Sequence, residues 1–193
     1  MMGEVEVKSS IEDRQALVKR IQEIGGVFVR EVAQEDVYFT HPCRDLKERD
    51  EALRLRREGS ETILTFKGKK AGGMAKVREE LEVGVASFKE ASAILKRLGF
   101  VEGLVVRKRR AVYVVGDVEV SLDSVEGLGE FVEVEAKAAA AGIDTEEGLQ
   151  LLDCAKSKVF DVADRLGLQR DRLSTASYLE LLESASSSSS ALR

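Results

Sequence analysis

The sequence predicts an α+β fold with about eight strands, a number that can close into a small β-barrel with a charged lumen and with helices packed on the outside. Three observations lead to this prediction. Short segments that alternate polar and apolar residues recur along the chain, separated by turn residues. Three longer segments have the apolar spacing of amphipathic helices. The polar faces of the strands consist almost entirely of Glu, Arg and Lys, whereas a face that only meets water would be more mixed.

Composition narrows the class of protein. The 193 residues are 44% hydrophobic and 34% charged, with a net charge of −5, which supports a packed core and argues against nucleic acid as the partner. No apolar run approaches the ~20 residues of a membrane helix. Only Cys43 and Cys154 occur, so we expect no disulfide framework and a reducing cytoplasmic location. With one histidine, His41, neither a Ser-His-Asp triad nor a zinc finger is expected.

Three segments have helical periodicity, and they are about Ile11–Ile24, Phe88–Leu98 and Thr145–Leu166. The first two each begin with a capping-box pattern, formed by Ser9 with Glu12 and by Ser87 with Glu90. A glycine follows the end of each of these two. The apolar side of the third segment includes Cys154, which we therefore expect in the core.

Eight alternating segments predict the strands, and these are Glu4–Lys8, Asp36–Thr40, Ala52–Arg57, Thr62–Lys67, Val77–Val83, Val105–Val115, Val118–Asp123 and Phe131–Lys137. The pair Gly116-Asp117 between two of them is a hairpin signal. We expect one domain over residues 1–183. The serine-rich stretch 184–193 is predicted to be a disordered tail.

The charge is divided along the chain. The segment Arg54–Arg110 contains 15 Lys and Arg against seven Asp and Glu, a balance of +8, and the remainder has a balance of −13. The period of two in a strand then concentrates like charges on single faces. Glu4 and Glu6 share a face with Lys8, and Arg54 shares a face with Arg56. Other charged positions on polar faces are Lys67, Arg78, Glu80, Glu82, Lys108, Arg110, Asp123, Glu133 and Glu135.

These charged faces have two interpretations. They can simply meet water while the apolar faces pack on helices, as in many antiparallel sheets. If the sheet closes, the acidic and basic faces instead converge on one lumen. Because unpaired buried charges are costly, the lumen would then need internal ion pairs, water, metal ions or a polyanion.

The segregated charges also suggest a chemistry. Glu4, Glu6, Glu133 and Glu135 could supply the oxygen ligands that Mg²⁺ or Mn²⁺ prefers. Arg and Lys at alternate positions match phosphate oxygens. A polyphosphate with bound metal would neutralise both sets, which is the logic of phosphoryl or nucleotidyl transfer. No phosphate-binding G-x-x-x-x-G-K-[ST] loop is present, and Gly68–Gly73 is interpreted as a flexible loop.

In this order the motifs resemble the CYTH family, the triphosphate tunnel metalloenzymes, over most of the chain to about Ala136. They are Glu4-x-Glu6-x-Lys8, Asp36-x-Tyr38-Phe39, Leu53-Arg54-x-Arg56, Thr65-x-Lys67-Gly68, Arg78-x-Glu80-x-Glu82, Lys108-x-Arg110, Asp123 and Gly129-x-Phe131-x-Glu133-x-Glu135. The Ser177-Tyr178 segment and the leucine-rich stretch after it resemble the ending of class IV adenylyl cyclases within that family.

The resemblance implies a closed eight-stranded antiparallel β-barrel, a tunnel open to solvent. It also implies an enzyme that uses Mg²⁺ or Mn²⁺ and acts on ATP, thiamine triphosphate or tripolyphosphate. It implies metal binding by Glu4, Glu6 and Glu135, with Glu133 assisting. It implies triphosphate binding by Arg54, Arg56, Lys67, Lys108 and Arg110. Lys8 and Asp123 would lie near the reacting end as catalytic residues. Arg78, Glu80 and Glu82 would have secondary roles in the lumen, and homodimers are common among such proteins.

Three hypotheses follow. The first is a class IV adenylyl cyclase that converts ATP into cyclic AMP and pyrophosphate. The second is a triphosphatase acting on tripolyphosphate or thiamine triphosphate. The third, from another class, is a non-catalytic module that binds nucleotides or polyphosphate. None of them involves nucleic acid or a membrane.

Overall fold

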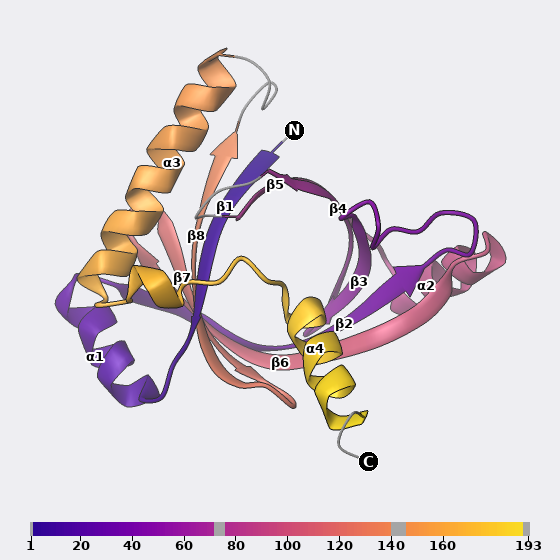
Figure 1. Cartoon of the computed structure of the whole chain (residues 1–193), viewed down its shortest axis with the longest axis horizontal. Coiled ribbons are helices and arrows are strands. Elements are labelled where there is room, and N and C mark those ends of the chain that lie inside the picture. Colours follow the sequence, from indigo (N-terminus) through magenta and orange to yellow (C-terminus); the bar gives the residue numbers. More distant parts are fainter. Residues whose placement is uncertain (1, 72–75, 140–145, 191–193) are drawn as a thin grey trace.

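The fold is a closed eight-stranded antiparallel barrel, as predicted (Figure 1). The computed structural model describes residues 2–71, 76–139 and 146–190. The strands follow one another around the barrel in the order β1-β5-β4-β3-β2-β6-β7-β8. Their bounds are β1 Met2–Ser10, β2 Val27–Thr40, β3 Ala52–Glu58, β4 Glu61–Ala71, β5 Lys76–Gly84, β6 Val101–Val115, β7 Val118–Val125 and β8 Gly129–Ala139.

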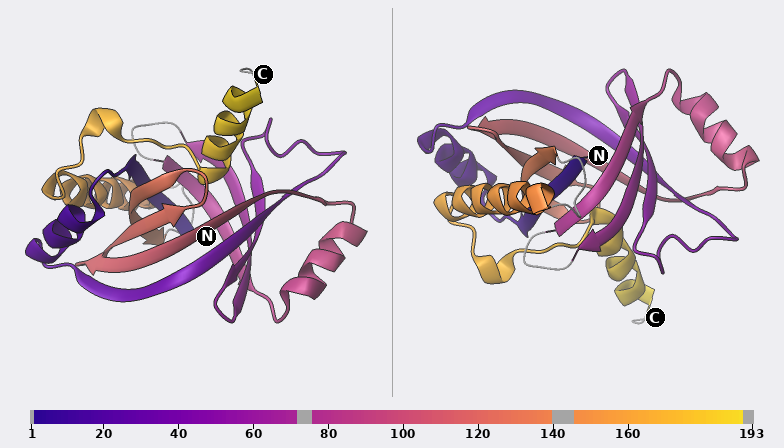
Figure 2. Two further views of the ribbon diagram at one scale, coloured as in Figure 1. Left: turned by 90° about the horizontal axis from the view of Figure 1, so that it is seen from below. Right: turned by 90° about the horizontal axis from the view of Figure 1, so that it is seen from above.

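The helices lie outside the barrel wall. Their bounds are α1 Arg14–Glu23, α2 Phe88–Arg97, α3 Glu146–Arg165 and α4 Tyr178–Ser190, with a short 3₁₀ helix, η1, at Arg170–Arg172. Figure 2 shows α1 and α3 together on one side of the barrel and α2 on the opposite side. Helix α3 packs on β8, β1 and β7, helix α2 packs on β3 and β6, and α4 contacts β6. Among the described residues, no helix combines the length and apolarity needed to cross a membrane.

The hydrophobic core lies between the barrel wall and the helices rather than inside the barrel. Val5 and Val7 of β1 and Val134 of β8 point outward and are almost completely buried against a cluster that includes Ile21 of α1 and Val159 of α3. A second cluster, around Leu55, Phe39 and Leu95, lies under α2. This inverted arrangement leaves the inner faces free for polar side chains.

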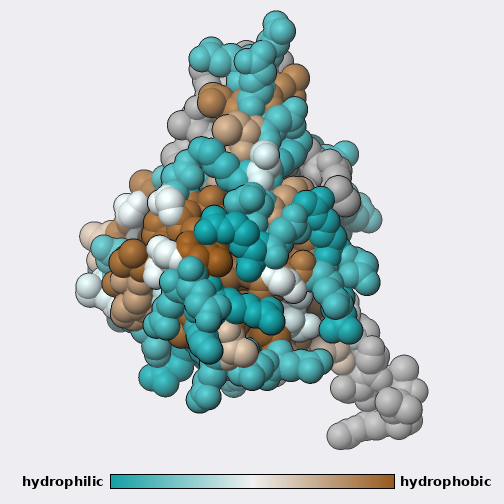
Figure 3. Space-filling model, turned by 90° about the vertical axis from the view of Figure 1, so that its left-hand side faces the viewer, coloured by the Kyte–Doolittle hydropathy of each residue, from teal (hydrophilic) through white to brown (hydrophobic). Residues whose placement is uncertain are grey.

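The helices do not cover the whole outer wall. Leu81 and Val83 of β5 are 52% and 55% exposed, and Val27, Phe28 and Val29 at the start of β2 are also exposed. The face that carries α1 and α3 shows hydrophobic residues in patches between hydrophilic ones (Figure 3).

All eight predicted strands are present, but one is much longer than expected. β2 begins at Val27 rather than near Asp36, because its first residues pair with the far end of β6, Phe28 lying opposite Tyr113. Those residues lack a clean polar alternation, so the pairing with β6 extends the strand. The Gly116-Asp117 hairpin between β6 and β7 is confirmed, with Gly116 at φ 63°.

The N-terminal cap of α2 is the one predicted, and the cap of α1 is a different residue. The Ser87 side chain accepts a hydrogen bond from the Glu90 backbone N–H at the start of α2, as the capping-box pattern predicts. The prediction for α1 was wrong, because β1 continues through Ser10. Asp13 caps α1 instead, accepting from the Ala16 backbone N–H.

Two expectations about side chains and the chain end are corrected. Cys154 is exposed rather than in the core, because it lies on the edge of α3 beside the buried stripe. The predicted disordered tail from Ser184 is helical to Ser190 as part of α4. Two of its serines satisfy their hydroxyls within the helix, since Ser184 Oγ and Ser186 Oγ donate to carbonyls four residues earlier. Residues 191–193 of that stretch, and Thr145 of the third predicted helix, lie outside the described residues.

Candidate active site

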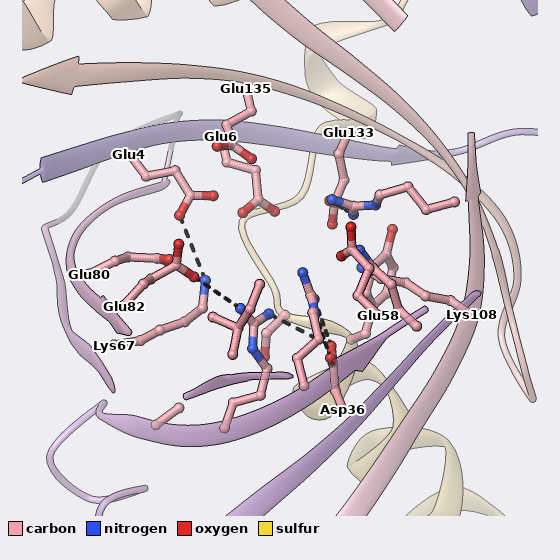
Figure 4. Close-up of a pocket in the computed structure, with 18 of the residues that line it drawn as sticks. Glu4, Glu6, Asp36, Glu58, Lys67, Glu80, Glu82, Lys108, Glu133 and Glu135 are labelled. Atoms are coloured by element: carbon pink, nitrogen blue, oxygen red, sulfur yellow. Dashed lines mark hydrogen bonds and ion pairs between the residues drawn. The ribbon is translucent and has the colours of Figure 1, made fainter. Parts of the chain in front are cut away.

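A charged cavity of about 240 Å³ occupies the barrel lumen (Figure 4). Every residue predicted for the site lines it except Asp123, which is fully buried on the inner face of β7 beneath Lys108 and Arg110. The alternation of the strands explains this convergence, because each strand presents its polar face inward and its apolar face to the core. The interpretation in which the charged faces simply meet bulk water is therefore wrong.

A row of acidic side chains crosses three neighbouring strands. Glu6 of β1 lies directly opposite Glu135 of β8, which in turn lies opposite Glu119 of β7. We call Glu6, Glu135 and Glu119 the carboxylate row. Glu4, two residues before Glu6 on the same face of β1, also lines the cavity. Figure 4 shows Glu6 and Glu135 extending into the cavity from these neighbouring strands. Burial, together with the negative charges of Glu4, Glu6 and Glu119, raises the pKa of Glu135 well above its ordinary value.

The carboxylate row has the ligand type of a metal site, but its side chains are not positioned around one common point. Within the part of the chain that the structure describes, no three Asp, Glu, His or Cys side chains are grouped closely enough to hold a metal ion as they stand. The donors are nevertheless all carboxylate oxygens, which suit Mg²⁺ or Mn²⁺. Like charges facing one another across strands are unfavourable, and the raised pKa of Glu135 reflects this. A divalent cation would relieve that repulsion, so these residues fit such an ion.

Lys8 separates the carboxylate row from the rest of the lumen. Its Nζ lies 2.8 Å from a carboxylate oxygen of Glu6 and 2.8 Å from one of Glu133. Burial alone would lower the pKa of Lys8, but these two carboxylates raise it above the ordinary value. Lys8 is therefore a fixed cation in the lumen. Its ammonium also lies 4.2 Å from the centre of the Tyr178 ring.

Glu133 is placed differently from the other acids assigned to metal binding. It forms ion pairs with Lys8 and with Arg110. Burial opposes its ionisation, yet Arg110 and Lys8 hold the pKa of Glu133 well below its ordinary value. The structure thus places Glu133 among the cations rather than in the carboxylate row.

Arginines line the side of the lumen formed by β2 and β3. Arg56 donates two hydrogen bonds to Asp36, of 2.7 and 2.8 Å, and Arg54 lies 3.7 Å from the same carboxylate. Burial would raise the pKa of Asp36, but Arg54 and Arg56 lower it below its ordinary range. Arg54 also donates to Thr65 Oγ1 at 3.1 Å. Its buried Nε–H has no hydrogen-bond partner among the described residues.

Asp123 organises the neighbouring cations rather than facing the cavity. It accepts hydrogen bonds from Arg110 Nε at 2.7 Å, from Lys108 Nζ at 3.2 Å and from the Tyr178 hydroxyl at 2.9 Å. Burial, aided by the charge of Arg110, lowers the pKa of Lys108 to about 8 despite Asp123. We call the group Arg54, Arg56, Lys108 and Arg110, with their partners Asp36 and Asp123, the cation wall.

Of the predicted residues on β4 and β5, Lys67, Glu80 and Glu82 form ion pairs or hydrogen bonds with other side chains. Lys67 pairs with Glu80 and lies 3.7 Å from Glu4. Glu82 accepts from Thr65 at 3.0 Å and lies 3.5 Å from Arg54. Glu80 and Glu82 therefore hold basic side chains in the described lumen.

Arg78 lines the cavity, but its hydrogen bonds go to backbone carbonyl groups of the protein. Its guanidinium donates to the backbone carbonyls of Gly68, at 2.7 Å, and Asp50, at 2.6 Å. It ties β4 and β5 to the loop before β3.

Several lumen residues were not predicted. Asp36 stands in a motif quoted above, and its alternation with Tyr38 was the available signal for an inward carboxylate. Gln34 and Glu58 continue the same inward faces of β2 and β3. Tyr178 gives no such signal, because it reaches the site from α4, after the barrel is complete. Ser174 pairs with Lys8 through two backbone hydrogen bonds and brings this segment to the lumen.

Comparison with known proteins identifies the family of this chain. A family model described as "CYTH domain" matches residues 2–168. The chain belongs to the CYTH family. Members of this family are adenylyl cyclases or triphosphatases and act on triphosphate substrates such as ATP.

Two named relatives of the CYTH family match nearly the whole chain. MJ0240 of Methanocaldococcus jannaschii, named as a candidate adenylate cyclase, is 37% identical over 180 residues, covering 93% of this chain and 98% of the relative. Adenylate cyclase CyaB of Aeromonas hydrophila is 29% identical over 183 residues, covering 93% of this chain and 88% of the relative.

Solved structures agree on the CYTH fold. The PH1819 protein of Pyrococcus horikoshii has a TM-score of 0.79 and 35% identity, with 94% of this chain and 98% of that one covered. HpAC1 of Hippeastrum, described as having a dominant triphosphatase activity, has a TM-score of 0.66 at 18% identity, covering 95% of this chain and 96% of that one. At that identity the second similarity concerns the fold alone.

Proposed function

We propose that this CYTH protein is a metal-dependent enzyme acting on triphosphates, specifically a class IV adenylyl cyclase that converts ATP into cyclic AMP and pyrophosphate. The observation that carries the proposal is that one small lumen contains both the carboxylate row, in which three glutamates face one another across neighbouring strands, and the cation wall. A triphosphate carrying a divalent cation complements both. The names of MJ0240 and CyaB support the choice of cyclase.

The cation wall would bind and orient the triphosphate. Arg54, Arg56 and Arg110 line the cavity with guanidinium groups that lie against Asp36 and Asp123. Because these cations are already oriented, they can stabilise charge on a leaving pyrophosphate with little reorganisation. Lys67 and Lys108 would add further positive charge.

The metal ligands would be Glu4, Glu6 and Glu135. An ion of Mg²⁺ or Mn²⁺ bound there would supply positive charge to phosphate oxygens and acidify a nearby hydroxyl. The covalent step is attack of the ribose 3′-oxygen on the α-phosphorus. The bond from that phosphorus to the bridging oxygen breaks, pyrophosphate leaves with the bonding electron pair, and the proton of the 3′-hydroxyl passes to solvent water. Lys8, fixed between Glu6 and Glu133, would hold the reacting phosphate at the boundary of the two regions.

A second candidate is hydrolysis of tripolyphosphate or thiamine triphosphate by attack of water on the γ-phosphorus. One observation favours it. The cavity of about 240 Å³ lies just below the roughly 300–1,000 Å³ typical of sites for small organic ligands. A bare triphosphate would occupy it without an organic group. The activity described for HpAC1 shows that one protein of this fold has triphosphatase activity.

Product identification separates these candidates. The protein is incubated with ATP and with tripolyphosphate, each with Mg²⁺ or Mn²⁺. Cyclic AMP with pyrophosphate supports the cyclase. Orthophosphate without cyclic AMP replaces it with the triphosphatase.

A non-catalytic binding module remains the alternative from another class. It predicts triphosphate-dependent thermal stabilisation with no turnover under either metal. The variant Glu6→Ala should then keep the metal-free part of the binding, whereas either enzyme should lose activity.

A further inference from the structure

The two ends of the cavity are lined by different elements. At one end, Ser177, Tyr178 and Leu179 line the cavity, and Glu180 of α4 lies 2.6 Å from Lys70 near the end of β4. The other end is marked by Glu58 and Glu61, which flank the β3–β4 turn at the beginning of β4. The Tyr178 ring, held by Asp123 and lying against Lys8 and Lys108, fills the α4 end. Because Tyr178 occupies the α4 end, the end beside the β3–β4 turn is where a group attached to a bound triphosphate is expected to extend.

A buried amide lies at that turn end. Gln34 of β2 is 4% exposed, lines the cavity and lies directly opposite Glu58 of β3. Its Nε2 donates to a Glu58 carboxylate oxygen at 2.6 Å. Arg30 holds the other oxygen of Glu58 at 3.1 Å. The carboxylate fixes the orientation of the amide, because the flipped amide would place two oxygens against each other.

This orientation leaves an acceptor without a donor. Gln34 Oε1 is buried and has no hydrogen-bond partner among the described residues. Buried carbonyl oxygens are normally satisfied, so an unpartnered acceptor on a side chain that lines the cavity is a candidate partner for a ligand group that donates a hydrogen bond. Ionised phosphate has only acceptor oxygens and cannot fill this role. Nucleoside hydroxyl and amino groups can.

We propose that Gln34, held by Glu58, is a specificity-determining residue that accepts a hydrogen bond from the nucleoside part of a nucleoside triphosphate. The inference rests on the proposed function, in which the phosphates lie on the cation wall. Among the described residues the Oε1 of Gln34 has no hydrogen-bond donor, and a nucleoside hydroxyl or amino group can supply one. The site would then select nucleoside triphosphates over tripolyphosphate by a hydrogen bond that tripolyphosphate cannot donate.

The test is Gln34→Met, which keeps the length of the side chain and removes its polar groups. Dissociation constants for ATP and for tripolyphosphate are measured by calorimetry, with kcat/KM for whichever substrate turns over. ATP binding should weaken by roughly three- to tenfold, the factor that one neutral hydrogen bond supplies, while tripolyphosphate binding stays unchanged. Glu35→Gln, on the next residue of β2 and on the outer face, is the matched control and should change neither.

Two analogues locate the donor. In the wild type, 2′-deoxy-ATP or a purine-riboside triphosphate lacking the 6-amino group should bind more weakly than ATP, and the Gln34→Met variant should no longer distinguish that analogue from ATP. Equal weakening of ATP and tripolyphosphate, or no change for ATP, overturns the inference. Because binding is measured, absence of turnover in the wild type would reject the proposed enzyme activity while leaving the role of Gln34 decided by the two affinities.

Discussion

The carboxylate row and the cation wall line the same lumen but differ in how their charge is compensated. In the cation wall, Arg56 and Arg110 each have a buried carboxylate within hydrogen-bond distance, Asp36 and Asp123 respectively. In the carboxylate row, Glu135 is flanked across both neighbouring strands by Glu6 and Glu119. Their pKa shifts run in opposite directions, with Asp36 lowered and Glu135 raised.

This difference separates a preorganised region from one that needs a ligand to complete it. The cations are held in place before any phosphate arrives, which limits the reorganisation needed for binding. In the row, the negative charges around Glu135 repel one another, and a divalent cation would reduce that repulsion. The comparison makes four predictions, taken from the largest expected effect to the smallest.

Neutralising Asp123, a buried carboxylate of the cation wall, should lower the stability of the protein more than any other change considered. Asp123→Asn keeps the shape but leaves Arg110 and Lys108 without their shared carboxylate. We expect the free energy of unfolding in urea to fall by about 3–5 kcal/mol, because the change leaves buried charges uncompensated. Asp117→Asn, which removes an exposed ion pair with Lys158, should leave the unfolding midpoint unchanged. If both variants behave alike, the cation wall is not held by Asp123.

Removing one cation should weaken ligand binding selectively. Arg54→Ala is expected to raise the dissociation constant for ATP or tripolyphosphate roughly 10- to 100-fold, the range of a charge-assisted hydrogen bond. Arg57→Ala on the same strand removes an outward arginine that contacts Glu35 and the Phe88 ring. Calorimetry should show that this control binds like the wild type. Unchanged binding by Arg54→Ala would reject the lumen as the triphosphate site.

Neutralising the centre of the carboxylate row should stabilise the metal-free protein. Since burial and like charges raise the pKa of Glu135, the folded state binds its proton more tightly than the unfolded state, and stability falls as pH rises through the folded pKa. Glu135→Gln removes that penalty, and we expect a gain of up to about 1 kcal/mol near neutral pH.

The same variant should also lose the thermal stabilisation that Mn²⁺ gives the wild type. Glu130→Gln on β8, where Glu130 pairs with Arg14 away from the cavity, should keep it. A Glu135→Gln protein that still responds fully to Mn²⁺ would show that the row does not bind the metal.

The smallest effect concerns pH. The pKa of Lys108 is lowered to about 8 by burial and by Arg110, so its charge declines between pH 7 and pH 9. Affinity for triphosphate should therefore fall severalfold over that interval. Lys108→Arg, which stays protonated, should flatten the profile. A wild-type affinity independent of pH in this range would place Lys108 outside the binding site.

Much of the fold was predictable because the period of two in a strand places charge and apolar residues on opposite faces. The same alternation placed Arg54, Glu6 and Glu135 in the lumen. It did not distinguish a side chain facing the cavity from one that supports the wall. Asp123 supports Arg110 and Lys108 from behind, and Arg78 donates to backbone carbonyls, although both lie on polar strand faces.

Other features depend on contacts between distant segments. The early part of β2 is a strand because β6 pairs with it, and its own residues give little signal. Tyr178 reaches Asp123 only because Ser174 pairs with Lys8, a contact that no local pattern encodes. The unpartnered oxygen of Gln34 likewise depends on Glu58 lying opposite it.

The pairing of β1 with β8 also has a consequence for the order of assembly. Glu6 and Glu135 belong to strands far apart in the sequence, so the seam between them can form only after the intervening six strands have been synthesised and brought together. Bringing such distant segments together costs loop-closure entropy before their contacts stabilise the fold, and this slows folding. The repulsion between these two glutamates lies on that seam. A divalent cation present during refolding should therefore speed the step that closes the barrel.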